Sequence, residues 1–391
     1  MENVRGIGLM LKYLAAICLI PVCHVELNAQ DTLYASLKTR LIEYYADSIE
    51  EVNGQIRKFP DEPYWYNKRG VLHYKSWEYE KAQKDYSLAI KKDPSFTLAY
   101  FNRGLAFKMN GQPVLALRDL DKFLANDSSD VEAFLVRADL LLTQNLLPQA
   151  EEDFLHILSI DPAHTEAHYG LATTYLNQGE YHSAISILDK GLSIDKGNSS
   201  FYLAKAKALE AINQPAEALA ILKAARTLSP QNLELLMRQA SLSVSLKEYE
   251  SALQAFNILA QKRRNDPIVL TSRSYVLIQL GEFEKALRDC DAALEADTTF
   301  YLTHSNRGLA NLRMGNLEAA EQDLLNTLRL NPDHPYAYRN LALLRIAQKY
   351  LDQACEAIHK GIELGFTETF GDELLRLRAE HCQATTESEE P

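Results

Sequence analysis

The stretch YFNRGLAFKMNGQPVLALRDL, residues 100–120, predicts two helices that cross closely. Its apolar residues recur at helical spacing, with Gly104 inside the first helical segment and Ala116 inside the second. Glycine within a helix costs roughly 1 kcal/mol relative to alanine, so a chain tolerates it there where two backbones must approach. We therefore expect Gly104 and Ala116 to form the two sides of one contact.

These two small residues recur along the chain in steps of 34 residues. The step from Gly104 always meets glycine, alanine or serine, and the step from Ala116 always meets alanine. The eighteen helix-packing residues are Gly70, Ala82, Gly104, Ala116, Ala138, Ala150, Ala172, Ala184, Ala206, Ala218, Ala240, Ala252, Ser274, Ala286, Gly308, Ala320, Ala342 and Ala354. A frame that never slips between residues 70 and 354 indicates an internal repeat.

A unit of this length and spacing resembles the tetratricopeptide repeat. Numbered from Pro63, positions 8 and 20 hold the small residues, and four copies hold at position 32 a proline that ends the second helix. The resemblance implies an all-α fold, an α–α superhelix of stacked antiparallel helix hairpins with capping helices at both ends. The nine expected repeats span residues 63–96, 97–130, 131–164, 165–198, 199–232, 233–266, 267–300, 301–334 and 335–368.

Each repeat is expected to turn near position 15. Glycine or asparagine occupies this position in six copies, and both residues are typical of helix ends. The six residues are Gly111, Asn145, Gly179, Asn213, Gly281 and Gly315. Positions 8 and 20 then lie where the two helices of the hairpin cross, and a longer side chain there would separate the backbones.

The amino-terminal residues 1–29 resemble a secretory signal peptide. Arg5 precedes an apolar stretch from Ile7 to Cys23, and Ala29 fits the last position before cleavage. We therefore expect an exported protein, periplasmic or secreted. Two alternatives remain open, an uncleaved segment that anchors the chain in a membrane and lipidation at Cys23.

The segments that flank the repeats are expected to cap them. Residues 30–62 form either an N-terminal cap or a degenerate repeat, because Ser36, Ser48 and Pro60 keep the frame. Residues 369–383 are expected to form a C-terminal capping helix, which covers the stacking face of the last repeat. Residues 384–391 read as an acidic, disordered tail.

Charge and cysteine content restrict the partners. The formal net charge of the 391 residues is -12, which disfavours nucleic acid. A membrane is expected as a partner only through lipidation at Cys23 or an uncleaved signal. Cleavage would leave three widely spaced cysteines and no disulfide framework. We expect Cys290 and Cys355 to be small buried hydrophobes and Cys382 to lie in a frayed tail.

The family resemblance also implies a binding groove, lined by positions 2, 5, 9, 12 and 13 of the first helices. The residues predicted to line it are Tyr64, Tyr74, Phe101, Met109, Leu135, Asp139, Glu166, Tyr169, Leu203, Glu210, Met237, Tyr275, Arg313, Tyr336 and Arg339. Aromatic residues and methionine suit adaptable binding surfaces, and the acidic residues fall in the middle of the series. A ligand with a basic centre would fit this pattern. The alternative is a set of ordinary solvated and packing residues.

The sequence offers no catalytic, cofactor-binding or metal-binding motif. In HTEAH, His164 and His168 have helical spacing, but Glu166 is not adjacent to a histidine as the zinc-protease arrangement requires. The lysine and asparagine with which chaperone-binding members clamp a carboxylate, at positions 5 and 9, occur in no repeat. Because repeats occupy residues 63–368, we expect a protein that is not an enzyme.

The resemblance implies a non-catalytic scaffold or adaptor that binds a protein or peptide segment in the groove, within an exported complex. Two alternatives stay open. The groove tyrosines suit the stacking of sugar rings, which would make the chain a carbohydrate or cell-wall binding protein. The chain would otherwise be a regulatory subunit of a partner enzyme.

Overall fold

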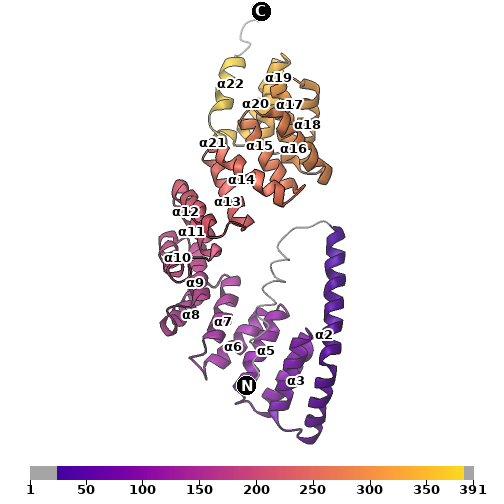
Figure 1. Ribbon diagram of the computed structural model, residues 1–391, viewed down its shortest axis with the longest axis vertical. Coiled ribbons are helices and arrows are strands. Elements are labelled where there is room, and N and C mark those ends of the chain that lie inside the picture. The colour runs from indigo at the N-terminus through magenta and orange to yellow at the C-terminus, as the bar shows by residue number, and fades with distance from the viewer. Residues whose placement is uncertain (1–23, 383–391) are drawn as a thin grey trace, which may run out of the picture. The chain divides into compact units, whose positions relative to one another are not determined.

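The computed structural model of the protein describes residues 24–382 (Figure 1). Most of the predicted signal segment and the predicted acidic tail lie outside these residues. Every regular element from residue 24 to residue 382 is a helix, so the predicted all-α class is confirmed. Contacts divide the chain into two compact halves, with the boundary between Lys196 and Gly197. None of the helices in this range is both long enough and apolar enough to span a membrane.

The N-terminal half contains one long helix, α2 (His24–Lys58), followed by four helix hairpins (Figure 1). Each hairpin lies within one of the predicted 34-residue frames, and each of the first three packs on the next along the chain. The hairpins are α3 (Pro63–Lys75) with α4 (Tyr79–Lys92), α5 (Thr97–Met109) with α6 (Pro113–Leu124), α7 (Val131–Thr143) with α8 (Leu147–Ile160), and α9 (Thr165–Gln178) with α10 (Tyr181–Ile194).

The C-terminal half contains five hairpins and two short terminal helices. The hairpins are α11 (Ser199–Ala211) with α12 (Pro215–Leu228), α13 (Leu233–Ser245) with α14 (Tyr249–Lys262), α15 (Pro267–Gln279) with α16 (Phe283–Ala296), α17 (Tyr301–Met314) with α18 (Leu317–Leu330), and α19 (Pro335–Ala347) with α20 (Leu351–Glu363). The chain continues with α21 (Phe366–Phe370) and α22 (Glu373–His381).

The two helices of each hairpin approach closely at the small residues. All eighteen helix-packing residues are buried. A Cβ atom added to Gly104 would lie 3.3 Å from Leu120 Cγ and 3.4 Å from the carbonyl oxygen of Ala116. At Gly308 the corresponding atom would lie 3.1 Å from Leu324 Cγ. Little more than a methyl group therefore fits between these helices, which accounts for the residue types at the two positions.

All nine hairpin turns within residues 24–382 place a left-handed residue at position 15, with φ between 58° and 83°. The following backbone N–H donates to the carbonyl five residues earlier, as Gln112 does to Phe107 at 2.9 Å, and this bond ends the first helix. Glycine and asparagine adopt such φ values readily and supply six of the turns. The other three turns use Trp77, Lys247 and Lys349.

The N-terminal flank is a cap and not a tenth hairpin. Helix α2 runs without a turn from His24 to Lys58, and Ser36 and Ser48 are exposed, unlike the small residues of the repeats. The degenerate-repeat alternative is therefore wrong. Near its end α2 packs on α3, where Val52 is only 3% exposed and the side-chain oxygen of Asn53 accepts a 2.8 Å hydrogen bond from Arg69.

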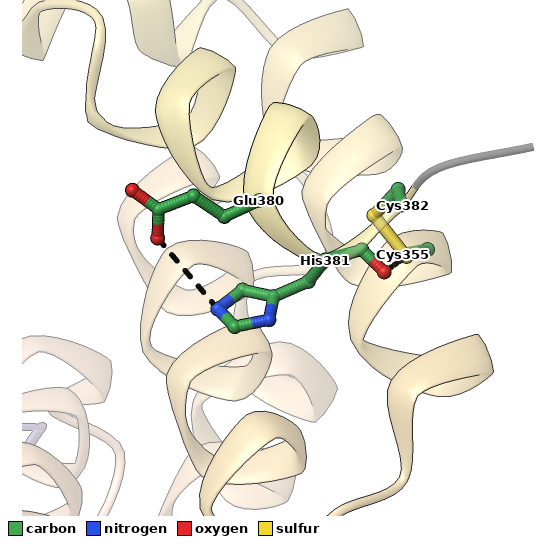
Figure 2. The surroundings of a disulfide bond; sticks show 4 residues. All are labelled: Cys355, Glu380, His381 and Cys382. Atoms are coloured by element: carbon green, nitrogen blue, oxygen red, sulfur yellow. Dashed lines mark hydrogen bonds and ion pairs between the residues drawn. A yellow bond between two sulfur atoms is a disulfide. The ribbon is translucent and has the colours of Figure 1, made fainter.

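The C-terminal flank folds back on the last hairpin and is tied to it by a disulfide (Figure 2). Gly371, at φ 95°, separates α21 from α22, so the cap is not one helix over residues 369–383. Leu374 is fully buried, and a Cβ atom on Gly361 of α20 would lie 2.6 Å from it. This packing brings Cys382 to Cys355, with their Cα atoms 5.7 Å apart.

The expectations for Cys355 and Cys382 were therefore wrong. Their pairing arises from the return of α22 along α20, a tertiary contact that cysteine spacing does not reveal. Cys290 is fully buried, as expected of a small hydrophobe. Burial raises the pKa of its thiol to about 12, so Cys290 is not a reactive thiolate at neutral pH.

Candidate functional site

The first helices of the hairpins carry the predicted groove residues, and six of the fifteen are exposed. We call the exposed side chains at positions 2, 5, 9, 12 and 13 the first-helix face. Of its large apolar members, Tyr64 is 47% exposed, Tyr169 41% and Met109 36%. The exposed charged members are Asp139, Glu166, Lys207, Glu234 and Arg313.

Six further predicted residues are half-buried and contribute only part of their surface. They are Leu135, Leu203, Glu210, Met237, Tyr275 and Tyr336. Glu210 is engaged within the fold, because its carboxylate accepts a 2.6 Å hydrogen bond from Arg238 in the next repeat.

Three predicted groove residues are buried, so their assignment to an accessible groove was wrong. Tyr74 is 7% exposed and packs edge-on against Tyr79, and burial raises the pKa of Tyr74 to about 12. Phe101 is 8% exposed and packs on Phe123. Arg339 is 8% exposed and bonds to Glu373 of the terminal cap. In each case a neighbouring element covers the position.

Position 2 carries most of the exposed apolar surface of the first helices. Besides Tyr64, three residues that the sequence analysis did not select stand here: Leu98, Ile268 and Leu302, exposed by 39%, 55% and 38%. Their common position in the repeat is the sequence feature that would have identified these three residues. Repeats 3, 4 and 6 hold glutamate at position 2 instead, namely Glu132, Glu166 and Glu234.

Ion pairs between positions 7 and 23 hold the first helices in place, and the sequence analysis missed them. In five repeats the arginine Nε and Nη2 atoms donate to both carboxylate oxygens of the aspartate, at 2.6–2.9 Å. The pairs are Arg69 with Asp85, Arg103 with Asp119, Arg137 with Asp153, Arg273 with Asp289, and Arg307 with Asp323. We call each pair a clamp.

Each clamp also reaches the preceding second helix. The arginine Nη1 donates to a side chain there, as Arg137 does to Asp121 at 2.8 Å. In repeat 1 the acceptor is Asn53 of α2, so α2 takes the place of a preceding second helix. One arginine therefore joins three helices and fixes the orientation of the first-helix face.

The clamp aspartates are nearly inaccessible, with side chains 3–10% exposed. Burial raises the pKa of Asp153 even though Arg137 opposes the shift, so the carboxylate depends on its partner to stay charged. Repeats 4, 5, 6 and 9 lack both members. Repeat 4, for example, places Leu171 and Ile187 in the corresponding positions, in one apolar cluster.

The two histidines of HTEAH serve the local structure. His164 caps α9, since its Nδ1 accepts a 3.2 Å hydrogen bond from the backbone N–H of Ala167. His168 is 5% exposed, and its Nε2 bonds to the carbonyl of Pro162 at 3.0 Å. Within residues 24–382 no group of three or more histidine, cysteine, aspartate or glutamate side chains is placed to hold a metal ion.

Curated proteins of known name are similar in sequence to this chain. Chicken DnaJ homolog subfamily C member 3 is 23% identical over 333 residues, which is 77% of this chain and 65% of the chicken protein. The human protein of the same name is 29% identical over 187 residues, 44% of this chain and 37% of the human one. The chain thus spans less than two thirds of these relatives.

Solved structures of similar architecture have low sequence identity. A tetratricopeptide repeat protein from Parabacteroides merdae has a TM-score of 0.48 and 17% identity, and the match covers 63% of this chain and 98% of that one. Yeast Tom70 has a TM-score of 0.42 and 15% identity, with 90% of this chain and 96% of that one covered.

Sequence models of the repeat itself match directly. One model described as a tetratricopeptide repeat matches residues 153–208 and 211–273, and a second with the same description matches 110–164 and 305–360. Together they cover more than half of the chain, in the region that folds as tandem hairpins. The chain therefore belongs to the tetratricopeptide repeat family.

Proposed function

We propose that this protein is a non-catalytic scaffold or adaptor that binds an extended segment of a partner protein along its first-helix face. The observation that carries the proposal is the recurrence of exposed apolar side chains at position 2, where Tyr64, Leu98, Ile268 and Leu302 are each 38–55% exposed. Within each half of the chain two of these side chains stand one repeat apart, and isolated contacts at such a spacing suit an extended chain.

The charges along the face favour a particular partner chemistry. In the N-terminal half, the apolar side chains of Tyr64 and Leu98 are followed by the carboxylates of the half-buried Glu132 and the exposed Asp139 and Glu166, of which Asp139 accepts a 3.1 Å hydrogen bond from Lys108 of the preceding repeat. A segment that carries apolar residues near lysine or arginine would complement this series, because long basic side chains combine an apolar stem with a charged end. The match to tetratricopeptide repeat models supports a protein-binding role.

Export is part of the proposal. The bond between Cys355 and Cys382 supports it, since structural disulfides persist mainly in oxidising compartments. The apolar segment ahead of Cys23 supports it as well. A carbohydrate ligand is less favoured, because Tyr64 and Tyr169 are the only predicted groove tyrosines that are exposed.

The test uses a double variant of two exposed tyrosines. Tyr64→Ala with Tyr169→Ala is expected to weaken capture of partner proteins from the native cell extract about tenfold or more, since aromatic side chains are frequent anchors of interfaces. The matched control, Leu155→Ala with Leu228→Ala, removes exposed side chains of the second helices α8 and α12 and is expected to capture as well as wild type. Equal capture by wild type and the tyrosine variant would refute the proposal.

A further inference from the structure

A cavity of about 330 Å³ opens in the C-terminal half, among α15, α16, α17 and α19. Ile278, Phe283 and Leu309, which come from three different helices, line its base; Ile278 and Leu309 are only 6% and 3% exposed, so the half-buried Phe283 is the most accessible of the three. Gln279 and Arg313, both at position 13 of their repeats, supply polar groups at the same cavity. The cavity thus combines an apolar surface with hydrogen-bond donors on the first-helix face.

One of the two arginines at this cavity is already neutralised. Arg339 donates from Nε and Nη2 to the carboxylate of Glu373, at 3.0 and 2.6 Å, and from Nη1 to Asn340 at 2.9 Å. Its guanidinium also lies 5.4 Å from the centre of the Tyr336 ring. With all three nitrogens engaged, Arg339 joins the cap to the last repeat and offers no free charge to a ligand.

The other arginine, Arg313, keeps its charge available. It is exposed and forms no ion pair with any side chain that the structure describes. It lies in the last turn of α17, where a cation also interacts favourably with the helix dipole. In a chain of net charge -12, the cavity therefore presents one uncompensated positive charge.

We propose that this cavity anchors the carboxylate of an aspartate or glutamate side chain within the partner segment. The guanidinium of Arg313 and the amide of Gln279 donate to that carboxylate, and a neighbouring apolar residue of the segment packs on the ring of Phe283. The inference rests on the proposed function and specifies the partner chemistry at repeats 7 to 9. A side chain is favoured over a free carboxyl terminus because these repeats lack the lysine and asparagine with which chaperone-binding members of the family hold a terminal carboxylate.

The test is a double-mutant cycle between Arg313 and an acidic residue of a selected peptide. Random 12-residue peptides, displayed internally so that no carboxyl terminus is free, are selected on the full chain. The tightest peptide is then synthesised with both ends blocked, and its affinity is measured by fluorescence anisotropy. We expect the selected peptides to be enriched in aspartate or glutamate. Arg313→Met should weaken binding about tenfold, as expected for a charge-assisted hydrogen bond.

Coupling between the two substitutions would show that Arg313 contacts the acidic residue of the peptide. Glutamine in place of the peptide's acidic residue should weaken binding about tenfold to wild type but hardly at all to Arg313→Met. Arg288→Met, at an exposed arginine of α16 that does not line the cavity, is the control and should bind like wild type. The thermal midpoint of Arg313→Met is measured alongside, and Arg313→Lys, which keeps the charge in the last turn of α17, separates lost binding from a weakened helix end.

Two results would overturn the inference. One is a selection without acidic enrichment, including one that yields no binder. The other is an acidic peptide that binds Arg313→Met and wild type equally. If the selected peptides lose affinity for Tyr64→Ala with Tyr169→Ala but not for Arg313→Met, the scaffold function stands and the acidic anchor does not.

Discussion

The clamp of repeat 3 can be tested by replacing its two residues with those that repeat 4 carries at the same positions. Arg137 and Asp153 form a bidentate pair, and the Asp153 side chain is 3% exposed. Repeat 4 fills the same two positions with Leu171 and Ile187. We therefore compare the single variant Arg137→Leu with the double variant that also carries Asp153→Ile.

The two variants are expected to differ widely in stability. Arg137→Leu leaves a buried carboxylate without its charged partner, which costs about 3–5 kcal/mol for a buried pair. It also removes the bond to Asp121, which is 62% exposed and contributes about 0–1 kcal/mol. The double variant removes both charges, and replacing a buried ion pair with apolar residues is often neutral. It should therefore recover at least about 2 kcal/mol of the loss.

Urea unfolding followed by circular dichroism measures the overall effect. Because neighbouring repeats contribute separately to stability, hydrogen exchange of peptides from α7 and α8 locates it. The penalty in Arg137→Leu should be largest at pH 7 and shrink towards pH 4, because the unpaired Asp153 has a pKa raised by burial and becomes neutral on protonation. A double variant as unstable as the single one would refute the account of the clamp.

Three further predictions concern single positions. Gly170→Ala should lower the urea midpoint, because the new Cβ atom would lie 2.3 Å from ring carbons of Phe154. Overpacking costs about 1–3 kcal/mol, which exceeds the gain of roughly 1 kcal/mol in helix propensity. An unchanged or higher midpoint would contradict this. Lys247→Gly should raise the thermal midpoint, because Lys247 has φ 60° and the left-handed conformation costs a residue with a side chain about 1 kcal/mol. A thermal midpoint that does not rise would show that this turn is not strained. His334 caps α19, because its Nδ1 accepts a hydrogen bond from the N–H of Ala337, and burial lowers the pKa of the imidazole. The stabilisation by neutral His334 is therefore present at pH 7.5. It falls as the pH drops below about 6.5, because the unfolded chain then binds the proton more readily than the folded one. The thermal midpoint of His334→Asn should therefore depend less on pH between 7.5 and 5.5 than that of wild type, and equal dependence would exclude this role.

The 34-residue period predicted the hairpins because every hairpin needs the same close contact between its two helices. Gly104 and Ala116 are small for one geometric reason, and the same reason applies in every repeat. The clamps follow the same step, yet the sequence alone did not reveal them. Their pairing becomes plain only when positions 7 and 23 are seen to face each other across the hairpin.

The site was harder to predict than the fold because exposure depends on neighbours outside the repeat. Phe101 has a groove position but is large enough to reach Phe123, so it joins the core. Arg339 also has a groove position, but Glu373 and the rest of the terminal cap cover it. The pairing of Cys355 with Cys382 likewise depends on the return of α22.

The most direct test of the binding role places a photo-crosslinking amino acid at single exposed sites and irradiates living cells. Tyr64 and Tyr169 probe the first-helix face, while Leu155 and Leu228 probe exposed sites on second helices. The account predicts crosslinks to other polypeptides from the two tyrosine sites and few from the two leucine sites. Crosslinks mainly from the leucine sites, or none from any site, would contradict it.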